Sequence, residues 1–336
     1  MNTTPSKLWP ILKRFPKLAK RLNPIVLCEL PTTVGALPGL GDNAWVKRDD
    51  LSNPVYGGNK TRKFEFIAAD ILRTKATHVV TLGGTGTNHG VATAMVCKEL
   101  GLDCTVITFD QPDSPFVQKN QALMRQFGAK LINAGSLALA AIRFYLHPRR
   151  LSKSYYFLAG GGGTALGTLA YVNAALELQQ QIENGDCPEP ESIYVAAGSV
   201  ATLAGLSLGC AIAGMKTKVI GIQIMDSHLG PVEICTAYTG NKLMQQALKI
   251  IQTQHPELII KLPPVILLSD WYSPGYGVQT LSTDNAVALA ASHGLQLDQT
   301  YSGKTFDAFT QALSHTTKPL LYWATYSSAK TNYDGS

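Results

Sequence analysis

Strand-like and helix-like segments alternate along most of this 336-residue chain. Short apolar runs typical of β-strands occupy 77–84, 104–109, 129–134, 154–159, 192–197, 217–224 and 319–325. Helical patterns lie between them, and one places apolar side chains three and four residues apart at Leu166, Leu169, Val172 and Leu176. Because strands that alternate with helices usually pair in parallel, this order predicts an α/β fold whose parallel sheets are covered by helices on both faces.

Three glycine-rich turns come directly after predicted strands. They read GGTGTNHG at 83–90, GGGGT at 160–164 and GSVAT at 198–202. Parallel sheets bind their ligands beyond the carboxyl ends of the strands. Each turn also exposes backbone N–H groups at the start of a predicted helix, where anions are bound favourably. The three turns are therefore candidate ligand-binding loops.

The composition, 45% hydrophobic and 15% charged, is that of a globular protein with one large domain or two moderate ones. No linker or repeat separates two domains, so a second domain is expected to be interleaved with the first. The net charge is +6, and the clearest basic run is Lys7, Lys13, Arg14, Lys17, Lys20 and Arg21. Because this run belongs to no known nucleic-acid-binding module, it predicts a solvated arm and no nucleic-acid partner.

Other composition features exclude several protein classes. Residues 192–215 carry no charge, but the GSVAT turn divides them into a strand and a helix, so no membrane span is expected. The N-terminus lacks the apolar core of a signal peptide. Six cysteines without a C-x-x-C pair predict reduced thiols in a cytoplasmic protein, and seven histidines without H-x-x-x-H spacing predict no metal site.

A lysine follows a glycine turn in YGGNKTRKFEF, residues 56–66. A P-loop requires glycine before the lysine, whereas this chain has Asn59, and no glycine turn is followed by the acidic residue of a dinucleotide site. A lysine near anion-binding turns suits pyridoxal phosphate, which needs an amine, a phosphate cup and a partner for its ring nitrogen. Burial and the neighbouring Arg62 and Lys63 are expected to lower the pKa of Lys60. A solvated surface lysine is the alternative.

Several motifs in a fixed order resemble the 1-aminocyclopropane-1-carboxylate deaminase and D-cysteine desulfhydrase family of pyridoxal-phosphate enzymes. They are VKRDDLSNPVYGGNKTRKFEF (46–66), TLGGTGTNHGVATA (81–94), GGGGTALGTLAYVNAALEL (160–178), YVAAGSVATLAGLSLG (194–209), WYSPGYG (271–277), TYSGKTFDAF (300–309) and LLYWAT (320–325). The resemblance implies two interleaved three-layer domains with parallel sheets, similar to the tryptophan synthase β-subunit (fold type II of these enzymes). The expected large domain is 1–62 with 163–336, and the small domain is 63–162.

The resemblance also implies roles for single residues. Lys60 would hold the cofactor as a Schiff base and then move protons at the substrate Cα, with Asn88 bonded to the 3′-oxygen of the cofactor. The phosphate would be bound by Gly198, Ser199, Val200, Ala201 and Thr202, at a helix start where backbone donors remain available while φ is negative. Tyr301 would lie against the pyridine ring, and Thr325 would complete the cofactor site.

The substrate is implied to meet Thr87, Asn88 and His89 through its carboxylate, and Tyr276 on another side. Asparagine also favours helix N-caps, so Asn59 and Asn88 could each cap a helix, and His89, Tyr276 and Tyr301 could serve packing alone. Thr87 replaces the family's serine and adds a methyl group. The segment after the last strand is usually glycine-rich in the family, whereas here it includes Tyr326, which could project into the site.

One further difference concerns Ser302. The deaminases have a glutamate there, next to the ring nitrogen, whereas desulfhydrases have a hydroxyl residue. The predicted activity is therefore α,β-elimination on a small amino acid such as D-cysteine, with Lys60, Thr87, Tyr276 and Tyr301 as catalytic residues. The alternatives are a cyclopropane deaminase and a diverged cofactor-binding protein without turnover. A homodimer is expected from the resemblance.

Overall fold

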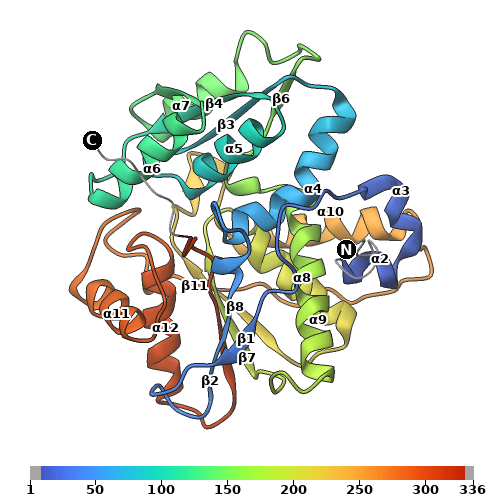
Figure 1. Cartoon of the computed structure of the whole chain (residues 1–336), viewed down its shortest axis with the longest axis vertical. Coiled ribbons are helices and arrows are strands. Elements are labelled where there is room, and N and C mark those ends of the chain that lie inside the picture. The colour runs from blue at the N-terminus through green and yellow to red at the C-terminus, as the bar shows by residue number, and fades with distance from the viewer. Residues whose placement is uncertain (1–8, 330–336) are drawn as a thin grey trace.

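Two separate sheets form the framework of the protein, which is described here for residues 9–329 from a computed structural model (Figure 1). The larger sheet contains, in spatial order, β1 (Val34–Ala36), β2 (Ala44–Lys47), β12 (Leu320–Trp323), β7 (Ser192–Ala197), β8 (Lys218–Gln223) and β11 (Ile266–Leu268). The smaller contains β5 (Lys130–Asn133), β4 (Asp103–Phe109), β3 (His78–Gly84) and β6 (Tyr155–Phe157). The predicted α/β class is confirmed.

All strand pairs in the two sheets are parallel except the edge pair β1–β2. Strand β12, near the C-terminus, lies between β2, near the N-terminus, and β7. The chain thus begins the larger sheet, builds the smaller one, and then returns to the larger. This path interleaves the two units in sequence, as the absence of a linker predicts.

Each face of the larger sheet has its own helical layer. Ile193 and Val195 of β7 pack into a core with α8 (Ala165–Glu183), α9 (Ala201–Ala213) and α10 (Ala237–Gln252). Tyr194, between them in sequence, packs on the opposite side with residues of α11 (Leu281–Ser292) and α12 (Ser302–Leu313). Because successive side chains of a strand point to opposite faces, a fully apolar strand supplies both cores. Figure 1 shows the two layers on either side of the strands.

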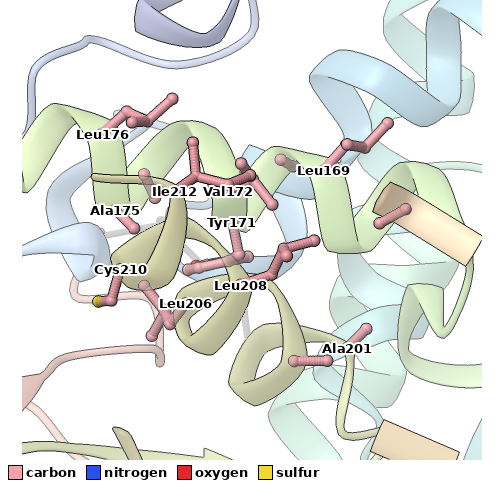
Figure 2. Close-up of a cluster of buried hydrophobic side chains, with 14 of the residues drawn as sticks. Leu169, Tyr171, Val172, Ala175, Leu176, Ala201, Leu206, Leu208, Cys210 and Ile212 are labelled. Carbon is pink, nitrogen blue, oxygen red and sulfur yellow. The ribbon is translucent and has the colours of Figure 1, made fainter. Parts of the chain in front are cut away.

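Helices α8 and α9 pack unusually closely because glycines of α9 face α8. A Cβ atom at Gly205 would overlap the backbone carbonyl of Thr168, and one at Gly209 would contact Ala175 and the backbone of Val172. Figure 2 shows side chains of both helices, among them Val172 and Ala175 of α8 and Leu206 and Leu208 of α9, within one buried cluster. The small residues of α9, which lies within the charge-free run 192–215, therefore serve helix packing.

The smaller sheet is also a three-layer unit. Val79 and Val106 pack with α5 (Asn88–Glu99) and α6 (Pro115–Gln126), whereas Val80 and Ile107 pack with α7 (Leu137–Tyr145). Since the strands of this sheet fall within 63–162 and those of the larger sheet fall outside it, we propose 63–162 as the small domain and 1–62 with 163–336 as the large one. Helix α4 (Asn59–Thr74) runs through the boundary at 62/63.

Helix α4 belongs to the cores of both units. Phe64, Ile67 and Ile71 pack with the smaller sheet, whereas Phe66 packs with α8 and the larger one. Arg62 forms buried ion pairs with Asp49 Oδ1 at 2.6 Å and with Glu177 Oε2 of α8 at 2.9 Å. These contacts fix the first turns of α4 against the larger unit.

The remaining described elements are short or lie outside the predicted pattern. They are α2 (Pro10–Arg14), η1 (Pro16–Leu18), α3 (Ala19–Leu22), η2 (Asp49–Leu51), η3 (Gly160–Gly162), and the antiparallel pair β9 (His228–Leu229) and β10 (Val232–Glu233). Lys7 of the predicted basic arm lies outside the described residues. The expectation of a solvated arm is wrong for the rest of that run, because Trp9, Ile11 and Phe15 are buried in the core that contains α8. Within residues 9–329, no helix is long and apolar enough to cross a membrane. The six cysteines are buried free thiols.

Candidate active site

A cavity of about 230 Å³ lies between the two sheets, where strands of both end. Gly83 and Gly84 of β3 and Phe109 of β4 line it from the smaller sheet. Ala196, at the end of β7, and Thr325, just after β12, line it from the larger sheet. The carboxyl ends of parallel strands are the expected place for a ligand in such folds.

Lys60 reaches the cavity from the first turn of α4, because the preceding glycines let the chain pass very close to its neighbours. Gly58 has φ 90°, and a Cβ atom there would overlap the Thr325 carbonyl oxygen. That oxygen instead accepts a hydrogen bond from the Asn59 backbone N–H at 3.0 Å. The prediction that Asn59 caps the helix is wrong, because Gly58 is the N-cap residue and Asn59 Nδ2 donates to Thr202 Oγ1 at 3.2 Å.

The amine of Lys60 is suited to act as a nucleophile and a base. Burial lowers the pKa of Lys60 to about 8, and the negative charge of Asp298 opposes part of that shift. The expectation that Arg62 lowers this pKa is wrong, because its guanidinium is paired with Asp49 and Glu177. Lys63 donates to the Gly161 carbonyl at 3.0 Å, and burial, followed by the Lys60 charge, lowers the pKa of Lys63.

The predicted phosphate loop connects β7 to α9. Gly198 and Ser199 line the cavity, whereas Val200, Ala201 and Thr202 lie behind them and are buried. Val200 is the N-cap residue of α9 and has φ 50°, so the expectation of negative φ is wrong. This left-handed conformation is rare for a β-branched residue. Left-handed turns before a helix direct successive N–H groups toward one point, which suits an anion.

Asn88 lies at the start of α5 and is held in place by two partners that the sequence interpretation did not include. Its Oδ1 accepts hydrogen bonds from the Tyr56 hydroxyl and from Asn120 Nδ2, both at 2.9 Å. The Nδ2 group of Asn88 has no partner within residues 9–329. Asn88 does not cap the helix, because Thr87 is the N-cap and accepts from the Gly90 N–H at 3.2 Å. Tyr56 is part of the quoted lysine motif, whereas no local pattern indicates Asn120.

His89 lines the cavity, but its ring is held by the protein. Nε2 donates to Thr81 Oγ1 at 2.9 Å, since that hydroxyl itself donates to the Leu158 carbonyl. The ring stacks on Phe64 at 6.0 Å between centroids. Burial, together with the charges of Lys60 and Lys63, lowers the pKa of His89 well below its ordinary value. A role in carboxylate binding would therefore fall to the helix start and not to a charged imidazole.

The additional methyl group of Thr87 has a specific place. A Cβ atom at either Gly83 or Gly90 would overlap the Thr87 side chain. The methyl group of Thr87 thus occupies space that these two glycines leave open. Thr87 still lines the cavity.

Tyr276 and Tyr301 form one side of the cavity, with their hydroxyls hydrogen-bonded to each other. The two rings meet edge to face, 5.9 Å apart. Burial raises the pKa of Tyr276 to about 12, with the Tyr301 hydrogen bond acting in the opposite direction. Burial also raises the pKa of Tyr301 well above its ordinary value. Both phenols are therefore protonated at neutral pH and can donate protons.

Ser302 does not line the cavity, because its hydroxyl is bound by Asp298. Ser302 Oγ donates to Asp298 Oδ2 at 2.7 Å and accepts from the Asp298 backbone N–H at 2.7 Å. Asp298 also accepts from the Tyr301 N–H at 2.6 Å, and burial raises the pKa of its carboxyl. Asp298 thus holds the turn that positions Tyr301. The sequence interpretation did not include this residue.

Tyr326 does not enter the cavity, so the expectation that it projects into the site is wrong. Its ring packs edge to face on Phe116 of α6, with 5.8 Å between centroids. This contact joins the C-terminal segment of the larger unit to the smaller one. Thr325 remains on the cavity wall, and its hydroxyl has no partner among the described residues.

These residues fit pyridoxal phosphate. Lys60 Nζ, Asn88 Nδ2 and the Thr325 hydroxyl all lie on the cavity wall without hydrogen-bond partners in the described chain. Space for a flat ligand is kept open by Gly161, where a Cβ atom would lie 2.8 Å from Ser199 Oγ and 3.9 Å from Lys60 Nζ. No group of residues that could hold a metal ion occurs within residues 9–329.

Comparison with known proteins identifies relatives along nearly the whole chain. The family described as pyridoxal-phosphate dependent enzyme matches residues 25–319. D-cysteine desulfhydrase of Klebsiella pneumoniae subsp. pneumoniae is 33% identical over 327 residues, which cover 93% of this chain and 94% of that protein. D-cysteine desulfhydrase of Salmonella paratyphi B is 31% identical over 321 residues and covers 90% of both chains.

Two solved structures share the fold of this chain. The crystal structure of an ACC deaminase homologue aligns with a TM-score of 0.78 and 26% identity, covering 98% of this chain and 97% of that one. A structure of O-ureido-L-serine synthase aligns with a TM-score of 0.59 at 14% identity, which shows a shared fold.

Proposed function

Because this chain belongs to the family of pyridoxal-phosphate-dependent enzymes, we propose that it catalyses α,β-elimination on a small amino acid, with D-cysteine as the reference substrate. The observation that carries the proposal is the Lys60 amine, which lies unpaired on the cavity wall with its pKa lowered to about 8. The similarity to two D-cysteine desulfhydrases supports elimination in particular.

The proposed cofactor site uses residues from both units. Lys60 would bind the cofactor covalently, the loop from Gly198 to Thr202 would bind its phosphate, and Asn88 Nδ2 would be available to its 3′-oxygen. Tyr301 would pack on the ring, and the Thr325 hydroxyl, which has no partner in the described chain, would be available to the ring nitrogen. Ser302 would support the part of the site around the cofactor ring indirectly, through its hydrogen bonds with Asp298.

The proposed substrate site lies next to Lys60. The substrate carboxylate binds at Thr87, Asn88 and His89, where the first N–H groups of α5 are available to an anion. Lys60 removes the proton from the substrate Cα, which its lowered pKa permits near neutral pH. Bound pyridoxal phosphate supplies the electron sink for the negative charge at Cα.

A proton donor assists departure of the sulfur by neutralising the thiolate as it leaves. The hydroxyls of Tyr276 and Tyr301 share a hydrogen bond and remain protonated, so Tyr276 can protonate the leaving thiolate, assisted by the Thr87 hydroxyl. Cleavage of the Cβ–S bond followed by hydrolysis converts cysteine and water into pyruvate, ammonia and hydrogen sulfide. Every atom of the reactants is present in these three products.

A second candidate is deamination of 1-aminocyclopropane-1-carboxylate. The alignment with an ACC deaminase homologue favours this activity. Against it, the position next to Tyr301 holds Ser302, and opening a carbon ring requires more stabilisation of charge than release of a thiolate. The third candidate is a cofactor-binding protein without turnover.

The experiment that tests the proposal compares the wild-type chain with Lys60→Ala. The wild-type protein is expected to bind pyridoxal phosphate with visible absorbance and to release sulfide and pyruvate in equal amounts from D-cysteine. Lys60→Ala removes the covalent anchor and the base, so pyruvate formation should fall by at least about 10³-fold. Lys98→Ala, on the exposed side of α5, is the control and should retain both properties.

A panel of amino acids separates the three candidates. 2-Oxobutanoate from the cyclopropane amino acid, without sulfide from either enantiomer of cysteine, would replace the proposal by the second candidate. Cofactor absorbance without any keto acid would favour the third. A homodimer and a cytoplasmic location remain predictions.

A further inference from the structure

The cavity extends well beyond the residues assigned to cofactor and substrate. Away from Lys60 its wall consists of Leu137 and Ala141 of α7, and of Met225, Leu229, Val232 and Ile234. The last four belong to the segment between β8 and α10, which includes the β9–β10 pair. One end of the cavity is therefore polar and contains the reactive amine, whereas the other end is apolar.

The apolar end opens to the surface between α7 and the β9–β10 pair. Val232 lines the cavity yet is 59% exposed, and Tyr145 lines it with 60% exposure. Apolar side chains that stay exposed around an opening are a recognised feature of ligand-binding grooves. This part of the wall is therefore both apolar and open to the surface.

The charge of the cavity wall further limits which substrate side chains can bind at the apolar end. Among the wall residues of the described chain, Lys60 alone carries a charged side chain. A carboxylate, sulfonate or phosphate on the substrate side chain would lose its hydration here without gaining a cationic partner. A free thiol would leave the apolar surface in contact with water.

We infer that the substrates of this site are amino acids whose β-sulfur carries an apolar group, namely S-alkyl cysteines. The inference rests on the proposed elimination and names its substrate class. The alkyl chain lies against Leu137, Ala141 and Val232, while the α-amino and carboxylate groups remain at the polar end.

The reaction balances without another reactant. Lys60 removes the Cα proton, the Cβ–S bond breaks with its electron pair on sulfur, and the alkanethiolate takes a proton from Tyr276. The Cα proton held by Lys60 then replaces the one that Tyr276 gave up, so both groups return to their starting states. The remaining three-carbon fragment is hydrolysed. One S-alkyl cysteine and one water therefore yield one alkanethiol, one pyruvate and one ammonia.

The expected gain in kcat/KM with alkyl length follows from the free energy of transferring apolar groups out of water. Each buried methylene contributes about 0.8 kcal/mol, which is about a fourfold increase in kcat/KM. S-methyl, S-ethyl and S-propyl cysteine are therefore expected to form a rising series, with S-propyl about 15-fold above S-methyl.

The test measures pyruvate release by the holoenzyme from both enantiomers of cysteine and of these three thioethers. A rising series supports the inference. Turnover of cysteine with a flat or falling series overturns it and leaves the proposed elimination intact. Pyruvate from none of the eight compounds overturns the proposed elimination itself. A second readout is the Kd of the unreactive 3-(alkylthio)propanoates by calorimetry, which should fall about fourfold per methylene.

Two pairs of variants test whether the preference for longer alkyl groups depends on the apolar wall residues. Val232→Gln should reduce the S-propyl to cysteine ratio of kcat/KM roughly fivefold. Val26→Gln is its control, because Val26 is also 59% exposed and does not line the cavity. Leu137→Gln and Leu139→Gln form the second pair, since both lie in α7 but only Leu137 lines the cavity. Equal ratios within both pairs would overturn the inference.

Discussion

A partly buried amine and the charge of one carboxylate set the proton chemistry available at this site. Lys60 has no hydrogen-bond partner in the described chain, and burial lowers its pKa from 10.5 to about 8. Asp298 acts in the opposite direction, although it does not contact the amine through any hydrogen bond. The balance of these two effects leaves a substantial neutral fraction near neutral pH.

Cofactor uptake should therefore depend on pH through Lys60. The neutral amine is the nucleophile, so the rate at which the apoprotein takes up pyridoxal phosphate should rise with pH and level off above about 8. A lysine with an ordinary pKa would give a rise that continues toward 10.5. Stopped-flow absorbance of the apoprotein across pH 6–10 measures the midpoint; a midpoint near the ordinary value would contradict the predicted burial effect.

Asp298→Asn tests whether the charge of Asp298 raises the pKa of Lys60. Because the Asp298 charge raises the pKa of Lys60, its removal should move the midpoint of cofactor uptake below that of the wild-type protein. Asp307→Asn is the matched control, since Asp307 is also a buried carboxylate but exerts no resolved effect on Lys60. An unchanged midpoint in Asp298→Asn, measured on a protein of native circular dichroism, would refute this role.

At the level of secondary-structure elements, a buried network fixes the helix that carries Lys60. Glu177 of α8 binds Arg62 of α4 at 2.9 Å and Lys47 of β2 at 2.6 Å. Burial alone would raise the pKa of Glu177, but Arg62 and Lys47 lower it to about 2. Glu177 is thus ionised in the fold and joins three elements from separate parts of the sequence.

Glu177→Gln should lower the free energy of unfolding by about 3–5 kcal/mol at pH 7, because it leaves buried cations without a full counter-charge. Urea unfolding measures the change, and Glu183→Gln on the exposed end of α8 should change it by less than about 0.5 kcal/mol. Since the folded pKa of Glu177 is depressed, its stabilisation is present above about pH 4.5 and is lost as pH falls toward about 2. The difference between Glu177→Gln and the wild type should therefore shrink in acid; a constant difference would contradict the ion-pair explanation.

A comparison of predicted and observed elements shows where the apolar pattern of the sequence located strands correctly. The predicted strands at 77–84, 104–109 and 192–197 agree with the structure to within about one residue, because fully buried parallel strands form continuous apolar runs. Strand β2 was not predicted, since it has four residues and is followed at once by charged ones. Helices α10, α11 and α12 were also not predicted as elements.

At the scale of the whole molecule, the site depends on two units being held together. Lys60, Gly198 and Thr325 approach the cavity from the larger unit, whereas Thr87 and Asn88 approach from the smaller. Contacts such as Tyr326 with Phe116 also cross between the units. A ligand in this cavity contacts both units at once.

Cofactor binding should therefore stabilise the entire chain. A ligand that binds only the folded state at 100 times its Kd adds about 2.7 kcal/mol, so the holoprotein should melt at a higher temperature than the apoprotein. Calorimetry of both forms measures the shift. Lys60→Ala should show a smaller shift, and inorganic phosphate serves as a control for the phosphate loop alone. Equal melting temperatures of holoprotein and apoprotein would contradict cofactor binding in this cavity.

The sequence alone determined the α/β class, the interleaving of the two units and the family. These properties depend on local periodicity and on several motifs in a fixed order, which a linear pattern records. Only the tertiary structure decided the left-handed φ of Val200, the capture of Ser302 by Asp298, the direction of Tyr326 and the apolar end of the cavity. The physical reason is that conformation and side-chain direction at these positions depend on packing and hydrogen bonds in the folded chain, and the apolar wall joins α7 to a segment about 90 residues away in sequence.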